Sequence, residues 1–287
     1  MSFPLNAEQF AQKIAKQIQT LPTLPDTAWK LKDLLAKPDC EFNDIRRVLE
    51  ADQGLCANLI RIANSPFYGH RGNVETLGEA VLTLGMRNLS NFVLVSYSNK
   101  VVLSHFGKLK NLPGYFKHSS MVSGAAYQIA KEAGASTRDQ EISKLGGLLH
   151  NIGRLVIAVA SEQWAFPFGE IQKESAERKN AGYDWLDECE VGMMVTRKWN
   201  FPEILSEAIG RHHSPVKGDD VNPIALTICL AELLTIDNLS VPIILSDFEP
   251  AILRRMHLSV SVLTRAREAY LEGLQQIAVS LQTPLTR

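Results

Sequence analysis

The sequence has few cysteines, and their spacing does not suit a shared site. The four are Cys40, Cys56, Cys189 and Cys229, and no two of them form a C-x-x-C pair. Structural zinc sites and the disulfide frameworks of small secreted proteins both need close, regular cysteine spacing. The pattern therefore argues against both, and reduced thiols in a cytosol are expected.

Long apolar runs are also missing. The first residues, MSFPLNAEQFAQKIAKQ, carry polar side chains throughout, unlike the apolar core of a signal peptide. No uninterrupted apolar stretch reaches the roughly 20 residues of a membrane-spanning helix. A soluble, cytoplasmic protein with no membrane partner is therefore expected.

Charge of one sign is not in excess. The 287 residues include 30 basic and 31 acidic side chains, which gives a formal net charge of -1. Proteins that bind nucleic acid through a general positive charge are strongly basic. Nucleic acid is therefore not indicated as a partner by net charge, although a local basic patch stays compatible with this total.

Two common signatures of nucleotide enzymes are absent. The chain contains neither G-x-x-x-x-G-K-[ST] nor G-x-G-x-x-G, so no phosphate-binding loop of the usual kind is predicted. Cys189 is the one cysteine near the polar residues discussed below. No spacing indicates a Cys–His pair for nucleophilic catalysis.

What the sequence does have is helical periodicity along nearly its whole length, with 45% hydrophobic residues to form a core. We predict an all-α fold without strand pairs, and we interpret VPIIL (241–245) as a packed loop. The helices are predicted over residues 6–20, 26–38, 43–52, 53–63, 77–85, 86–99, 115–134, 184–199, 202–213, 222–236 and 259–281, and a further helix begins at 137 and carries His150.

Several helix ends are predicted from capping residues. Asn6 with Gln9, and Thr137 with Gln140, resemble capping boxes, and Asn222 followed by proline is a helix start. NAG at 180–182 is typical of a helix end, and Asp184 of the next start. The turn-rich stretch GKLKNLPG (107–114) is the best boundary between two helical halves.

Several polar side chains could form a divalent-metal site, because such sites in helical proteins use histidine and carboxylate groups from several helices. Each also has a structural explanation, as a hydrogen-bonded core histidine, a helix-terminal charge or an amide that joins two helices. The candidates are His118, His150, Asn151, Glu188 or Glu190, His212, His213 and Glu232.

Two features of this set carry the most information. His212 and His213 are neighbours, so both side chains reach one site only where a helix ends, as Pro215 indicates. Glu232 lies among apolar residues in LAELL, and a buried glutamate must be paired, protonated or bound to a metal.

The chain resembles the HDOD family, a non-standard branch of the HD metal-phosphohydrolase superfamily. The resemblance covers most of the sequence. The N-terminal half is represented by LPTLP, LIRIANSPFYG and LGEAVLTLGMRNLSNFVL, and the C-terminal, HD-like half by KHSS, GGLLHNIGRLVI, KWNFPEILSEAIGRHHSP and LAELL. It implies two lobes, an N-terminal helical lobe over 1–110 and an HD-like lobe with a C-terminal capping helix over 111–287.

The resemblance also implies a metal-ligand set. His118 takes the place of the first histidine, and His150 with Asn151 takes the place of the His-Asp doublet. His212 and His213 take the place of the paired histidines. Glu232 stands where the family has a late aspartate, and a further ligand position falls near Glu188. The ion would be divalent, Mn, Fe or Mg.

Asn151 departs from the pattern of the catalytic relatives. An amide oxygen can bind a metal ion but brings no charge, so it weakens affinity for a hard ion and leaves bound water less acidic. We therefore expect a bacterial signal-transduction module that binds a protein partner or a small nucleotide-like ligand. The alternative is a metal-dependent phosphohydrolase that acts on phosphoesters through the same residues.

Overall fold

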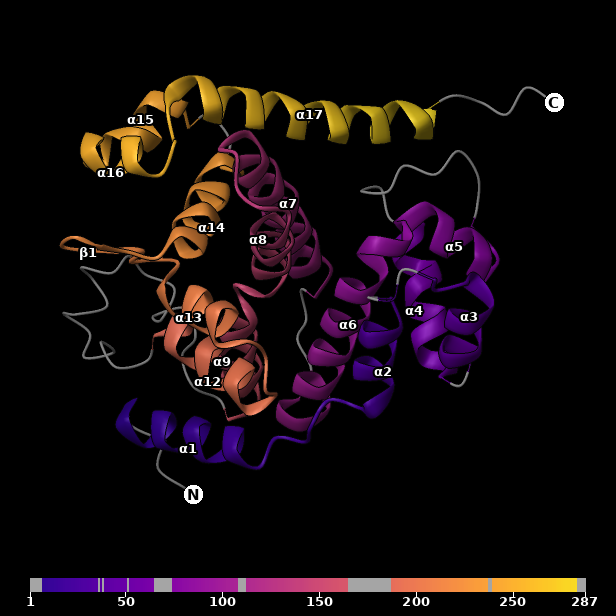
Figure 1. Ribbon diagram of the computed structural model, residues 1–287. Coiled ribbons are helices and arrows are strands. Elements are labelled where there is room, and N and C mark those ends of the chain that lie inside the picture. The colour runs from indigo at the N-terminus through magenta and orange to yellow at the C-terminus, as the bar shows by residue number, and fades with distance from the viewer. Residues whose placement is uncertain are drawn as a thin grey trace. The chain divides into compact units, whose positions relative to one another are not determined.

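The computed structural model describes residues 7–35, 37, 39–50, 52–64, 74–107, 112–164, 187–236 and 239–282. The fold is all-α, as predicted (Figure 1). The chain forms two compact units: unit 1 comprises residues 1–23 and 101–268, and unit 2 comprises residues 24–100 and 269–287.

Unit 1 carries all the candidate ligands named above. Its elements are α1 (Ala7–Gln19), α7 (Leu112–Glu132), α8 (Thr137–Leu149), α9 (Ile152–Gln163), α12 (Glu188–Lys198), α13 (Glu203–Arg211), β1 (Val216–Lys217), β2 (Asp220–Val221), α14 (Pro223–Leu234), α15 (Val241–Ser246) and α16 (Pro250–Arg255). α7 packs on α8 and α14, and α12 packs on α9 and α13.

Unit 2 is built from α2 (Asp26–Leu35), α3 (Phe42–Glu50), α4 (Gln53–Ala63) and α5 (Leu77–Leu84). Within it the hydroxyl of Tyr97 donates to Asp52 Oδ2 at 2.9 Å, and Lys100 Nζ lies 3.6 Å from the same oxygen. Two helices, α6 (Met86–Phe106) and α17 (Val260–Gln282), contribute residues to both units.

The boundaries of the two units differ from those of the predicted lobes. The change from unit 2 to unit 1 falls at Lys100 and Val101, inside α6. α1 belongs with unit 1 because it packs on α9 and α12. The assignment of 1–110 and 111–287 as functional domains stays a prediction.

Some local predictions need correction. VPIIL forms the short helix α15, because Pro242 occupies its first turn and Val241, Ile244 and Leu245 share a buried face. β1 and β2 make a two-residue antiparallel pair with Val216 opposite Val221, which was not predicted.

Helix starts show the same mixture. Asn222 caps α14 as predicted, since its side chain accepts from the backbone N–H of Ala225 at 2.9 Å. α8 is capped by Ser136 rather than by Thr137, because the Ser136 hydroxyl accepts from Asp139 N at 3.1 Å. The predicted caps at Asn6, at 180–182 and at Asp184 lie outside the described residues.

One stretch, Thr137–Gln163, is long and apolar enough to cross a membrane by length and composition. However, 78% of its most apolar window is buried inside the fold. It is also divided into α8 and α9 by the turn at His150 and Asn151. This is the environment of core helices.

Candidate metal centre

Two glycines let the helices that carry the candidate ligands approach closely. A Cβ atom at Gly147 of α8 would lie 2.7 Å from the Cα of Ser123, which brings α8 against α7. A Cβ at Gly153 of α9 would overlap the carbonyl oxygen of Glu188, at the start of α12. Side chains from α7, the α8–α9 turn and α12 therefore converge.

His150 lies at the floor of the cluster and is fully buried. Its Nδ1 lies 2.8 Å from the carbonyl oxygen of Gly147. Because a carbonyl oxygen can only accept, Nδ1 carries the hydrogen and Nε2 keeps its lone pair. Burial lowers the pKa of His150 to about 4, although the nearby Glu232 carboxylate opposes this shift. A neutral imidazole with an open Nε2 is the form that binds metals.

His212 is arranged in the same way at the end of α13. It is fully buried, and its Nδ1 donates to the carbonyl oxygen of Ile209 at 2.7 Å. Burial lowers its pKa well below 6.5, and the neighbouring imidazoles of His213 and His150 add to the effect. Since α13 ends at Arg211, the adjacent rings of His212 and His213 lie 4.2 Å apart. The predicted end of the helix at this pair is confirmed.

Glu232, on α14, is the carboxylate at the centre of the cluster. Its Oε1 lies 3.8 Å from Nε2 of His118 and 3.9 Å from Nε2 of His150, and its Oε2 lies 3.6 Å from Nε2 of His213. Burial alone would raise the pKa of Glu232, but the nearby imidazoles, first of all those of His118 and His213, lower it overall. Glu232 is half-buried, with 22% of its side chain exposed, and it is paired, which is one of the three states predicted for it.

His118 completes a compact group of three potential ligands. Its Nε2 lies 3.3 Å from Nε2 of His150, so that two imidazole nitrogens and one Glu232 oxygen fall within 4.8 Å of one another. The side chain of His118 is 37% exposed, whereas His150 is buried. The group is thus open to solvent on the His118 side, which provides a path for an ion to enter.

Glu188 joins the cluster through His213. Its Oε1 lies 3.6 Å from Nε2 of His213, and its Oε2 lies 4.0 Å from Nε of Arg154. Although burial alone would lower the pKa of His213, the Glu232 and Glu188 carboxylates raise it. His213 therefore links two carboxylates, which favour its protonated form.

Asn151 is buried, but its side chain does not form the hydrogen bond that is usual for an asparagine at a helix start. It occupies the N-cap position of α9, where an asparagine side chain normally accepts from the first turn, but it makes no such bond. Its Oδ1 has no hydrogen-bond partner among the described residues, and the side chain is 2% exposed. An unsatisfied buried amide oxygen beside His150 is what an additional metal or ligand contact would satisfy.

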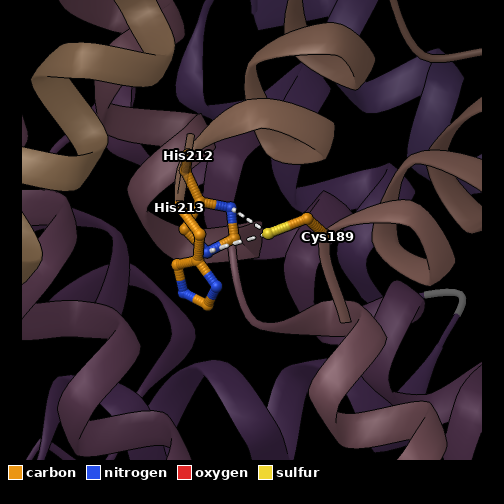
Figure 2. Close-up of side chains that lie close together, drawn as sticks. All are labelled: Cys189, His212 and His213. Carbon is orange, nitrogen blue, oxygen red and sulfur yellow. Dashed lines mark hydrogen bonds between the residues drawn. The ribbon is translucent and has the colours of Figure 1, made fainter. Parts of the chain in front are cut away.

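Cys189 also lies in the cluster, which sequence spacing did not indicate. Its Sγ lies 3.4 Å from Nδ1 of His212, and Figure 2 shows the thiol directed at that imidazole. Cys189 follows Glu188 at the start of α12, and this adjacency was the one signal in the sequence. The spacing along the chain gave no reason to pair Cys189 with a histidine, and the fold places it beside His212.

The structure brings together six of the seven candidate ligands through direct contacts: His118, His150, Glu188, His212, His213 and Glu232. Asn151 is next to His150 in the chain and buried. Glu190, the alternative to Glu188, is exposed and makes no contact with the cluster that the structure describes. The donor set of imidazoles and carboxylates suits a divalent transition metal. Binding of an ion by these residues stays a prediction.

The glycine contact yields a stability prediction. Gly153→Ala places a methyl group 2.5 Å from the backbone nitrogen of Gly192 as well as against Glu188, so the α9–α12 contact must open. The expected loss in free energy of unfolding is about 2 kcal/mol or more. Gly78→Ala is the control, since its Cβ would lie 3.5 Å from Phe42 and should be neutral or slightly stabilising. Denaturant titration of both variants measures the difference, and equal stability would contradict the contact.

Acid stability yields a second prediction for protein kept in chelator. The folded pKa of His150 is about 4 against an ordinary 6.5, so between these values the unfolded state takes up a proton that the folded state does not. Stability therefore falls as pH drops through this window, by about 2 kcal/mol between pH 6.5 and 4.5 from His150 alone. Denaturant unfolding of the wild type and His150→Gln at pH 6.5 and pH 4.5 isolates the contribution of His150. The same loss of stability between the two pH values in both proteins would contradict it.

Comparison with known proteins places these features in a family context. The HDOD domain model matches residues 21–215. An uncharacterized protein of Treponema pallidum is 27% identical over 242 residues, which are 78% of this chain and 44% of that protein. The chain thus spans less than half the length of this curated relative.

Solved structures show the same fold at low sequence identity. A Shewanella amazonensis protein provisionally named a phosphohydrolase has a TM-score of 0.64 at 22% identity, covering 93% of this chain and 97% of its own. A Marinobacter aquaeolei protein provisionally named a signal transduction protein has a TM-score of 0.64 at 19% identity, covering 95% of this chain and 64% of its own.

Proposed function

Since the chain belongs to the HDOD domain family, we propose that it is a regulatory module of bacterial signal transduction that works by binding rather than by hydrolysis. Its ligand would be a protein partner or a small nucleotide-like molecule. The names of two structural neighbours, one for signal transduction and one for phosphohydrolysis, are compatible with either role.

The metal centre is the part of this proposal that the geometry supports best. Three imidazole Nε2 atoms lie within 4 Å of the Glu232 carboxylate, and the Nδ1 atom of His150 is held by a backbone carbonyl. Such outer contacts fix the orientation of ligating histidines. A divalent ion here would be held by His118, His150 and Glu232, and it would supply positive charge for binding an anionic group.

The single observation that argues against hydrolysis is the neutral amide of Asn151. A catalytic centre needs negative charge beside the ion to orient a nucleophile and to accept its proton. Asn151 can supply an oxygen but not a base, and the carboxylates of Glu188 and Glu232 are already engaged with histidines.

The second candidate function is metal-dependent phosphoester hydrolysis. It is favoured by Glu188, whose second oxygen faces Arg154 rather than a histidine, and by the four converging imidazoles. In this case Glu188 would replace the missing carboxylate as the base.

Elemental analysis of protein purified without chelator, followed by a phosphodiesterase assay with manganese, tests the proposal. We expect about one or two ions per chain and no turnover above that of manganese alone. Turnover that disappears in His150→Ala would establish the second function instead. Absence of metal in the wild type would remove the metal centre from the proposal.

A further inference from the structure

An exposed apolar patch lies on unit 2, where α3 and α5 both pack on α4 (Figure 1). Leu82 of α5 is 84% exposed, and Phe42 of α3 is 36% exposed. Gly78 lies one helical turn before Leu82, and a Cβ atom there would lie 3.5 Å from Cζ of the Phe42 ring. Phe42, Gly78 and Leu82 are therefore neighbours, and together they are called the α3–α5 patch.

The packing of unit 2 does not explain the residues of this patch. The residues that α5 buries are Ala80, Val81 and Leu84, so Leu82 is not part of the core. Gly78 does not have a positive φ, and a Cβ atom there would make only ordinary contacts, so neither the backbone nor the packing requires glycine. Single exposed apolar residues are common on protein surfaces, but here two of them flank a glycine that leaves an aromatic ring uncovered.

The rim of the α3–α5 patch is acidic. Each of the two helices carries one carboxylate within two residues before its start and another in its first turn. These residues are Glu41 and Asp44 for α3, and Glu75 and Glu79 for α5. Glu79 is engaged in the capping box of α5. Glu41 and Glu75 are exposed, and their side chains make no contact that the structure describes, so their charges are available to a partner.

The charge of this rim selects the kind of partner. Arg46 lies one turn after Phe42 on α3, but it pairs with Glu50 at 2.7 Å, so the two together add no net charge. A negative rim repels nucleic acid, an anionic membrane and the same face of a second copy of this chain. It is complementary to a surface that combines apolar and basic side chains.

We propose that the α3–α5 patch binds a basic amphipathic helix of a protein partner. An apolar side chain of that helix would lie over Gly78, between Phe42 and Leu82, and its lysine or arginine side chains would face the acidic rim. Recognition of a helix by apolar anchors one turn apart, within a polar rim, is a common mode of transient binding. The proposal rests on the protein partner of the proposed function but not on the metal centre, because the patch belongs to unit 2 and the candidate ligands belong to unit 1.

Fluorescence anisotropy of a labelled helical peptide, titrated with the full chain, tests this proposal. The probe is an alanine-based peptide with leucines four residues apart and lysines on both flanks, and its counterpart has glutamates in place of the lysines. The wild type is expected to bind the lysine peptide, more weakly as salt is added, and not to bind the glutamate peptide. Leu82→Ser should weaken binding about tenfold. Ile243→Ser is the matched control, because Ile243 is 56% exposed on α15 of unit 1, and it should bind as the wild type does.

Gly78→Ala separates binding from folding. Its methyl group makes only ordinary contacts with Phe42, so the free energy of unfolding should stay the same or rise. The same methyl group occupies the space over the ring, so binding of the lysine peptide should weaken about threefold or more. A variant that binds normally would overturn the placement of an apolar side chain over Gly78.

The remaining outcomes decide between occupants of the patch. A wild type that does not bind the lysine peptide, or that binds both peptides equally, would overturn the proposal. Equal losses in Leu82→Ser and Ile243→Ser would overturn it as well. A dimer in sedimentation analysis that Leu82→Ser dissociates would assign the patch to a second copy of the chain instead. Leu82→Ser should keep the metal content of the wild type, so failure of this proposal leaves the metal centre standing, and absence of metal leaves the patch standing.

Discussion

Replacing Glu232 with glutamine is expected to weaken binding of a divalent ion by roughly 100-fold or more. Among the residues that the structure describes, Glu232 is the carboxylate that lies within 4 Å of His118, His150 and His213 together. Glutamine keeps the shape of the side chain but removes the negative charge that would balance a bound cation. Calorimetric titration of manganese or zinc into chelator-treated protein measures the change.

Glu190→Gln is the matched control for this substitution. Glu190 is a carboxylate in the first turn of α12, but it is exposed. We expect the Glu190→Gln variant to bind the ion with the same affinity as the wild type. Equal affinity in Glu232→Gln would show that the carboxylate pairs the histidines for stability alone, and the metal centre would then be abandoned.

The sequence alone predicted the all-α class and most of the candidate ligands, for physical reasons that differ between residues. Glu232 was identified because a carboxylate in an apolar helix must be compensated, and the structure supplies three imidazoles. His212 and His213 were identified because a following proline ends the helix, which lets neighbouring side chains meet.

Other features could not be predicted from local patterns. Cys189 meets His212 because α12 packs closely on α13, where a Cβ at Gly192 would lie 2.8 Å from Cγ2 of Ile209, and a sequence does not show which glycines lie at helix contacts. The turn that ends α8 at His150 was also missed, since LLHNIGRL is continuous in apolar periodicity. The position of α1 in unit 1 depends on tertiary packing alone.

The substitution Asn151→Asp is expected to have opposite effects without and with metal. In chelator, the new carboxylate is buried beside His150 without a partner, and stability should fall by about 1–3 kcal/mol. With manganese or zinc, the added charge supports the ion, and affinity should rise roughly 10-fold to 100-fold. Thermal unfolding with and without the ion measures both effects in one experiment.

Asn99→Asp is the matched control for a buried charge. Asn99 is 3% exposed, neither polar atom of its side chain has a partner among the described residues, and it belongs to unit 2. An aspartate there should destabilise the protein equally with and without metal. If Asn151→Asp behaves in the same way, Asn151 does not face the ion, and the metal set must be assigned without it.

A phosphodiesterase assay of Asn151→Asp tests whether the neutral side chain at position 151 is what prevents hydrolysis. If the wild type lacks turnover only because this position carries no charge, the variant should gain phosphodiesterase activity in manganese that His150→Ala removes from it. A variant that binds the ion more tightly but stays inactive would show that the remaining ligands do not orient a nucleophile. In that case the centre is a binding site, and a carboxylate at position 151 is insufficient for hydrolysis.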